Sequence, residues 1–117
     1  MTTLELWISQ ACHAFELEAD FAYVVDLGNG RQVRAVARVR GLGARNGMLI
    51  VRNYEDVRPY AEVLVRAGYG YSVLDEPRSD EEFDLELFRR MFLDWGWSGN
   101  SGDRSRLLLK DSRRTLR

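Results

Sequence analysis

The chain has 117 residues, of which 45% are hydrophobic and 30% charged, and its formal net charge is −1. This length suits one globular domain, and the composition is too rich in apolar residues for an intrinsically disordered chain. No stretch approaches the roughly 20 apolar residues of a membrane helix, and the start lacks a signal-peptide pattern, so we expect a cytoplasmic protein that does not enter membranes.

The opening segment predicts a helix over residues 3 to 13. Thr2, followed three residues later by Glu5, has the spacing of a capping box. A short strand through residues 4 to 8 is the alternative. The apolar residues of the segment recur at helical spacing: Leu4, Trp7, Ile8, Ala11, Cys12 and Phe15.

A β-hairpin is expected next, because residues 15 to 27 and 33 to 39 alternate between apolar and polar side chains around Gly28-Asn29-Gly30. A two-residue turn would mix the two faces. A three-residue loop with Gly30 in the left-handed conformation matches them. Its register pairs Val25 with Val33, Tyr23 with Ala35 and Phe21 with Ala37, and it sets Asp20 opposite Arg38 and Glu18 opposite Arg40.

The middle of the chain predicts a strand-helix-strand crossover. Residues 48 to 51 form a short apolar strand, expected to be central. Asn53 or Asp56 caps a helix that runs to about Ala67, with Pro59 in its first turn. The inward residues of this helix are expected to be Val57, Ala61, Leu64 and Val65. A strand over residues 69 to 74 then returns to the sheet, parallel to the first.

A final helix is expected from Ser79 to Trp95, ended by Gly96, with Trp97 partly exposed in the following turn. Residues 98 to 102 resemble a linker, and residues 107 to 109 fit either a strand or a helix. The sequence therefore predicts an α+β domain over 1–98. It has a mixed sheet of about four to five strands, an antiparallel hairpin or meander plus the crossover, packed with two to three helices. We expect residues 99–117 to be a basic tail, which could be ordered against the body or a partner chain.

Catalytic chemistry finds little support in the residues. Cys12 and His13 are the only residues of their types, and neighbours on a helix point about 100° apart, so Cys12 is interpreted as a core residue and His13 as a surface residue. One Cys and one His cannot form a structural zinc site. No cofactor or metal is expected. The acidic run from Asp75 to Glu86 is dense enough for a divalent ion or an acid–base pair, but helix capping and a solvated face are the favoured interpretation.

The segment Arg38-Val39-Arg40-Gly41-Leu42-Gly43-Ala44 resembles the phosphate loop of N-acetyltransferases. In that family the Gly-rich turn opens a helix whose N-terminal amides hold a pyrophosphate. Here residues 45 to 51 predict a turn and a strand instead. The loop is therefore interpreted as a connection between strands.

By elimination, we expect a protein-binding domain: an inhibitor, an antitoxin or immunity-type neutraliser, or an adaptor. The body, residues 1–98, carries 11 Arg and 16 Asp or Glu, giving −5, whereas residues 99–117 carry 6 Lys or Arg and 2 Asp, giving +4. A basic protein partner would meet Asp75, Glu76, Glu81 and Glu82, with Tyr71 or Trp97 as an aromatic anchor.

Two other functions stay open. A nucleic-acid-associated regulator would contact phosphates through the tail residues Arg104, Arg106, Lys110, Arg113 and Arg114. A small enzyme would need a pocket that gathers Asp75, Glu76 or Asp94. Homodimerisation is compatible with all three, with the hairpin edge or the tail as the shared surface.

Overall fold

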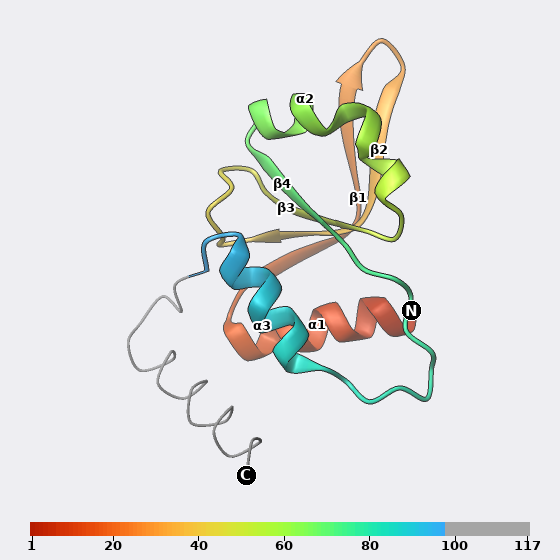
Figure 1. Ribbon diagram of the computed structural model, residues 1–117, viewed down its shortest axis with the longest axis vertical. Coiled ribbons are helices and arrows are strands. Elements are labelled where there is room, and N and C mark those ends of the chain that lie inside the picture. Colours follow the sequence, from red (N-terminus) through yellow and green to blue (C-terminus); the bar gives the residue numbers. More distant parts are fainter. Residues whose placement is uncertain (98–117) are drawn as a thin grey trace.

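The computed structural model describes residues 1–97 and confirms the α+β fold (Figure 1). One helix precedes three strands, and a fourth strand and a last helix follow a short helical connection. In chain order the elements are α1 (Thr3–Phe15), β1 (Glu18–Gly28), β2 (Arg31–Arg40), β3 (Gly47–Val51), the 3₁₀ turns η1 (Tyr54–Asp56) and η2 (Arg58–Tyr60), α2 (Ala61–Arg66), β4 (Tyr69–Val73) and α3 (Leu85–Asp94).

The four strands form one mixed sheet in the order β1-β2-β3-β4. The first three make an antiparallel meander, and β4 lies parallel to β3 after the α2 crossover, as predicted. All five residues of β3 are buried. This strand is therefore central, and β1 and β4 are the two edges.

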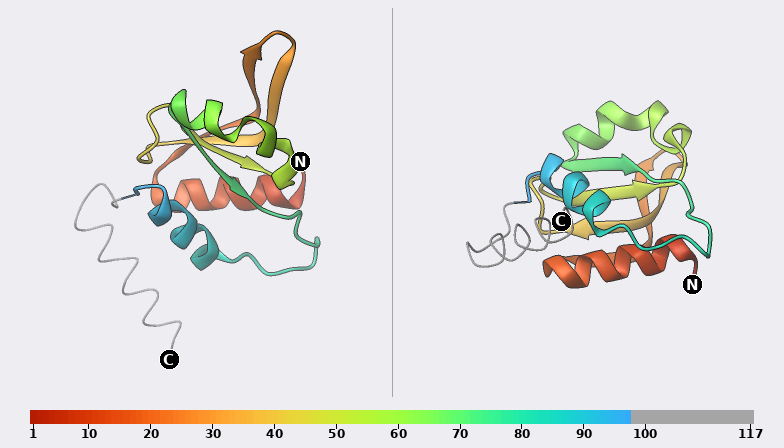
Figure 2. Two further views of the ribbon diagram at one scale, coloured as in Figure 1. Left: turned by 45° about the horizontal axis from the view of Figure 1, so that its top comes forward. Right: turned by 60° about the horizontal axis from the view of Figure 1, so that its bottom comes forward.

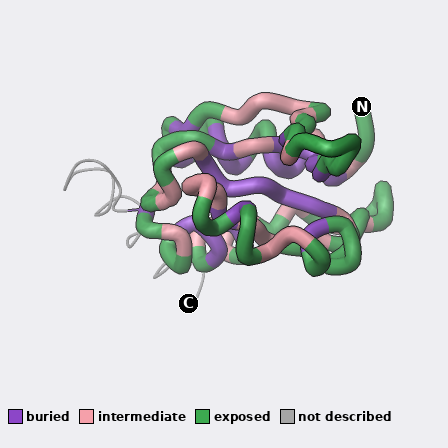
Figure 3. Tube along the Cα trace, turned by 90° about the horizontal axis from the view of Figure 1, so that it is seen from above, coloured by how far each residue is buried: buried purple, intermediate pink, exposed green. Residues whose placement is uncertain are grey.

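Helices cover both faces of the sheet (Figure 2). α1 and α3 lie against one face and α2 against the other. Alternate residues of β3 divide accordingly, since Met48 and Ile50 belong to the cluster with α1 and α3, while Leu49 and Val51 belong to the cluster with α2. The buried segments consequently run through the centre of the molecule, with exposed segments around them (Figure 3).

The first helix begins with the capping box that the sequence predicts. The Thr2 hydroxyl accepts a hydrogen bond from the Glu5 backbone N–H at 3.1 Å, and the Glu5 carboxylate accepts one from the Thr2 N–H at 3.0 Å. Glu16, in the left-handed conformation, ends the helix. The residues predicted to face inward are buried, and the segment is a helix rather than the alternative strand.

The register of the hairpin is the predicted one, from the Glu18–Arg40 pair to the Val25–Val33 pair. The loop differs from the prediction. Gly28 pairs with Arg31 across a two-residue Asn29-Gly30 turn, and a bulge between Asp26 and Gly28 absorbs one residue. Asn29 and Gly30 both have positive φ, as the tight turns of two-residue hairpins require. The bulge restores the face matching that a plain two-residue loop would lose.

Within β1, Ala22 has a left-handed φ of 51°, which an L-residue rarely adopts inside a strand. Phe21 packs with the α1 and α3 cluster, whereas Tyr23, two residues later, packs with the α2 cluster. Residues two apart in a regular strand share one face. The turn of the backbone at Ala22 therefore transfers the distal half of the hairpin onto the α2 side.

Two predicted helices have different bounds in the structure. The helix expected from Asn53 or Asp56 is instead two 3₁₀ turns followed by α2, and its expected inward residue Val65 is 56% exposed. Pro59 lies in the second 3₁₀ turn, and proline has no N–H and disrupts a continuous helix. The last helix starts at Leu85, because Asp84 rather than Ser79 caps it.

Candidate partner-binding surface

The acidic segment connects β4 to α3 without regular secondary structure and passes the N-terminal end of α1 (Figure 1). Glu76 fixes its first half. One carboxylate oxygen accepts the Leu4 backbone N–H at 2.8 Å, and the other accepts the Arg52 guanidinium at 3.0 Å. The Leu4 N–H, assisted by Arg52, holds the pKa of Glu76 below its usual value because both stabilise the ionised carboxylate.

The second half of the segment is held by four contacts. Arg78 lies 3.2 Å from the Asp80 carboxylate and 3.5 Å from that of Glu81. Phe83 packs edge-on against Trp7 of α1, with ring centroids 5.6 Å apart. Asp84 accepts the Leu87 backbone N–H at 3.1 Å and so caps α3. The segment is thus anchored at both ends by side-chain contacts.

These anchors divide the predicted partner-binding carboxylates into two groups. Glu76 and Glu81 are engaged with arginines of the same chain. Asp75 and Glu82 are exposed, and neither forms an ion pair or hydrogen bond within the described part of the chain. Asp75 and Glu82 are therefore the two of these four carboxylates that have no arginine partner in residues 1–97, whereas Glu76 is exposed but ion-paired.

The expected exposure of Trp97 is wrong, because its side chain is only 5% exposed. The backbone N–H of Trp97 donates to the Phe92 carbonyl at 2.9 Å, and the backbone N–H of Gly96 donates to the Leu93 carbonyl at 3.1 Å. This pair of bonds is the Schellman motif, whose glycine at positive φ turns the next residue back onto the helix. The Trp97 ring then packs 4.7 Å from the Phe15 ring. The sequence Trp95-Gly96-Trp97 could have predicted this burial, since an apolar residue after the glycine that ends a helix commonly packs inward.

Tyr71, the other predicted anchor, lies on the edge strand β4 and is partly exposed. Its ring lies 6.4 Å from that of Trp95. Trp95 covers the other face of the strand, where its indole N–H donates to the Ser72 hydroxyl at 3.1 Å. Gly70 makes room for this ring, because a Cβ there would lie 2.5 Å from two of its carbon atoms. Of the two aromatic candidates, Tyr71 is the accessible one.

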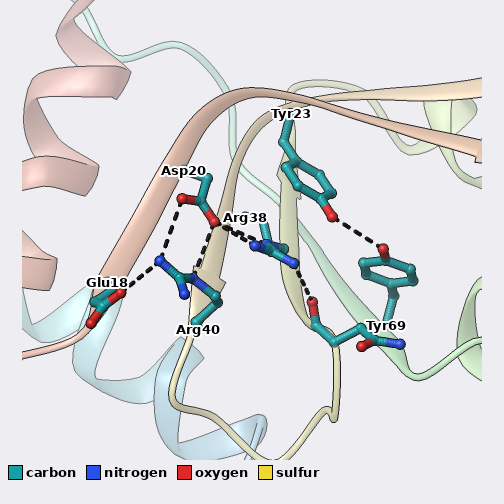
Figure 4. A network of polar contacts seen from close by, with 7 residues as sticks. Glu18, Asp20, Tyr23, Arg38, Arg40 and Tyr69 are labelled. Atoms are coloured by element: carbon teal, nitrogen blue, oxygen red, sulfur yellow. Dashed lines mark hydrogen bonds and ion pairs between the residues drawn. The ribbon is translucent and has the colours of Figure 1, made fainter.

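Two arginines of the hairpin, Arg38 and Arg40, belong to a polar network (Figure 4). Arg38 lies 2.7 Å from the Asp20 carboxylate, and Arg40 lies 2.6 Å from Glu18 and 3.1 Å from Asp20. The Arg38 hydrogen bond lowers the pKa of Asp20 below its usual value. The acid-to-arginine pairs predicted from the register are confirmed, and they offset the charges of Arg38 and Arg40.

The same network continues into aromatic groups. The Arg38 guanidinium lies 4.4 Å above the Tyr23 ring, and the Tyr23 and Tyr69 hydroxyls are 3.2 Å apart. The network therefore connects Tyr23 of β1 and Tyr69 of β4, the two edge strands, with Arg38 of β2. The basic residues predicted to contact phosphate, Arg104, Arg106, Lys110, Arg113 and Arg114, lie outside the described residues, as do residues 107 to 109.

The carboxylates of the enzyme hypothesis are not brought together. Asp94 lines a pocket of about 480 Å³ with Gly68 and Tyr69, at the start of β4, whereas Asp75 and Glu76 follow the end of that strand. In residues 1–97, no three His, Cys, Asp or Glu side chains are placed to hold a metal ion. A second pocket, of about 500 Å³, lies between the start of α1 and the bend in the hairpin, and Arg34, Arg52, Glu5 and Asp56 line it with both signs of charge.

The remaining chemical candidates have structural roles. Cys12 is buried, and this burial raises the pKa of its thiol to about 12, so the reactive thiolate is scarce at neutral pH. His13 is exposed. In the Gly-rich loop, the Gly43 N–H donates to the Trp95 carbonyl, and a Cβ on Gly43 would lie 2.9 Å from that oxygen. The loop leads into β3 and not into a helix, so it is a connection between strands, as expected.

None of the helices formed by residues 1–97 combines the length and the apolar character that a membrane crossing requires. Comparisons of the chain with models of protein families, with curated proteins and with solved structures found no significant match in any of the three.

Proposed function

We propose that this chain is a small protein-binding domain, of the inhibitor, antitoxin, immunity or adaptor type, that presents the acidic segment to a basic partner. The observation that supports it most directly is the anchoring of the segment at Glu76 and Asp84, with Asp75 and Glu82 exposed and without ion pairs to any of residues 1–97. A segment that is already ordered loses little entropy on binding.

The charge distribution favours the same function. Eight of the arginines in the described residues form ion pairs with neighbouring carboxylates: Arg38, Arg40, Arg52, Arg58, Arg66, Arg78, Arg89 and Arg90. The carboxylates that no arginine of the described residues compensates include Asp75 and Glu82 of the acidic segment. Such charges accelerate association with a basic surface more than they raise the final affinity. A cationic cleft, such as the active site of a nuclease, has the matching chemistry.

The test is capture of a partner from a lysate of the native host, followed by binding kinetics with the purified partner. We expect one stoichiometric basic protein, and an association rate that falls with salt. The double variant Asp75→Asn with Glu82→Gln should lower that rate by about tenfold, in the range reported for the loss of steering charges.

Glu55→Gln with Glu62→Gln is the matched control, because it removes the same charge from η1 and α2 on the opposite face of the sheet. This control should bind like the unmodified chain. Recovery of no stoichiometric protein, or equal association rates for both double variants, would contradict the proposal.

A further inference from the structure

The two edges of the sheet are built differently. β1 carries Glu18, Asp20 and Asp26 and is distorted at Ala22 and at the bulge before its turn. Charges and distortions of this kind prevent an edge strand from pairing with another chain. β4, whose sequence is Tyr-Gly-Tyr-Ser-Val, has neither a charged residue nor a proline, and no other strand of the described residues lies beyond it (Figure 2).

Alternate backbone groups of β4 are directed away from β3, where another strand could bond to them. Leu74 donates its N–H to the Val51 carbonyl at 2.9 Å, and the parallel register aligns Val51 with Val73. Alternate residues of a parallel strand bond to the same neighbour, so residues 70, 72 and 74 bond to β3. The N–H and C=O groups of Tyr69, Tyr71 and Val73 therefore point away from the sheet.

Apolar side chains accompany these outward groups. Val73 is 39% exposed and Val65 of α2 is 56% exposed. Val65 lines the same pocket as Tyr69, and so lies beside the start of β4. Tyr71, at the middle of the strand, is partly exposed and contacts Trp95. An edge strand flanked by exposed apolar residues is the usual surface for addition of a further strand.

The charges at the two ends of β4 are complementary to each other. Arg45 lies beside Gly68, just before the strand, and Asp75 follows it directly. Neither forms an ion pair among the described residues. The carboxylate that lines the same pocket as Arg45 is that of Asp94. In an antiparallel pair of identical strands, the start of one strand meets the end of the other, so Arg45 and Asp75 of different copies would be neighbours at both ends.

We propose that the β4 edge binds a second copy of this chain, antiparallel, about a two-fold axis through Tyr71. Tyr71 pairs with itself, and Tyr69 pairs with Val73 of the second copy. This arrangement uses about six inter-strand hydrogen bonds and joins four strands from each copy into one continuous sheet. The proposed shared surface is β4, whereas the sequence by itself suggests the hairpin edge or the tail.

The mass of the full-length chain in solution, measured by sedimentation over a wide concentration range, tests this proposal. We expect a reversible dimer. Val73→Lys places a charge on the edge and should weaken dimerisation at least tenfold. Val24→Lys is the matched control, since Val24 is 43% exposed but lies on β1, and it should dimerise like the unmodified chain. A monomer at all concentrations, or equal dimerisation of the two variants, would overturn the proposal.

Hydrogen exchange of the unmodified chain gives a second measurement that does not depend on the folding of a variant. The amides of Tyr71 and Val73 should be protected in concentrated samples and exchange rapidly in dilute ones. Protection that is independent of concentration would show that another part of the same chain covers the edge, and would also overturn the proposal. Asp75→Arg should weaken the dimer, and Arg45→Asp in the same chain should restore it. Failure of this restoration would refute the proposed alignment of the strands.

Discussion

Gly70 has a specific packing role beneath the Trp95 ring, and replacing it with alanine tests that role. The added Cβ would lie 2.5 Å from two ring carbons, whereas carbon atoms in contact prefer about 3.5–4.0 Å. The ring would therefore have to move by about 1 Å, which breaks or bends its hydrogen bond to Ser72.

The magnitude follows from three contributions. Overpacking costs about 1–3 kcal/mol, and a weakened Trp95–Ser72 hydrogen bond costs about 1 kcal/mol. Alanine offsets about 0.5–1 kcal/mol, because glycine loses more backbone entropy in a strand. We expect Gly70→Ala to lower the free energy of unfolding by about 1–3 kcal/mol in total.

Urea denaturation followed by circular dichroism measures this change, and a double-mutant cycle isolates its cause. In a Trp95→Ala background the obstructing ring is absent, so Gly70→Ala should be neutral or stabilising by about 0.5 kcal/mol. Equal destabilisation by Gly70→Ala with and without the Trp95 ring would refute the packing argument.

Three further predictions concern side chains whose surroundings the structure defines. Trp97→Ala should lower the free energy of unfolding by about 3–5 kcal/mol in urea titrations, because the indole is buried; an unchanged stability would contradict that burial. The pKa of Glu76 is lowered in the folded state, so its contribution to stability is present above the pKa of an unfolded glutamate and disappears as the pH falls through the folded value. Unfolding curves of the unmodified chain and Glu76→Gln should therefore differ at pH 7 and converge as the pH falls below the folded pKa, and a constant difference would argue against the ionised contact. The Cys12 thiol, with a pKa of about 12, should react with a thiol reagent only after urea is added, and rapid reaction of the native chain would contradict this expectation.

Much of the fold could be predicted from the sequence because its strongest patterns are local. Helical spacing behind Thr2 predicted α1, and alternation of apolar residues around Gly28-Asn29-Gly30 predicted the register of the hairpin. The continuous apolar run of β3 correctly indicated a central strand. These patterns report which way successive side chains point, and that direction depends on the backbone of a few neighbouring residues.

The site was less predictable, because its properties depend on residues that are distant in sequence. The acidic run of the sequence contains no indication that Glu76 binds Leu4 and Arg52 while Asp75 has no such contact within residues 1–97. Likewise, the proline-containing segment before α2 has helical spacing, but only the fold determines which of its apolar residues meets the sheet.

The sequence by itself indicated the order of the main helices and strands, the pairing of β1 with β2 and the parallel crossover to β4. Only the tertiary structure decided that Trp97 is buried against Phe15, that Ala22 turns the hairpin onto the α2 side, and that β4 is an edge without protecting charges. The physical reason is that periodicity fixes the directions of side chains along one element, whereas exposure depends on which other element lies opposite.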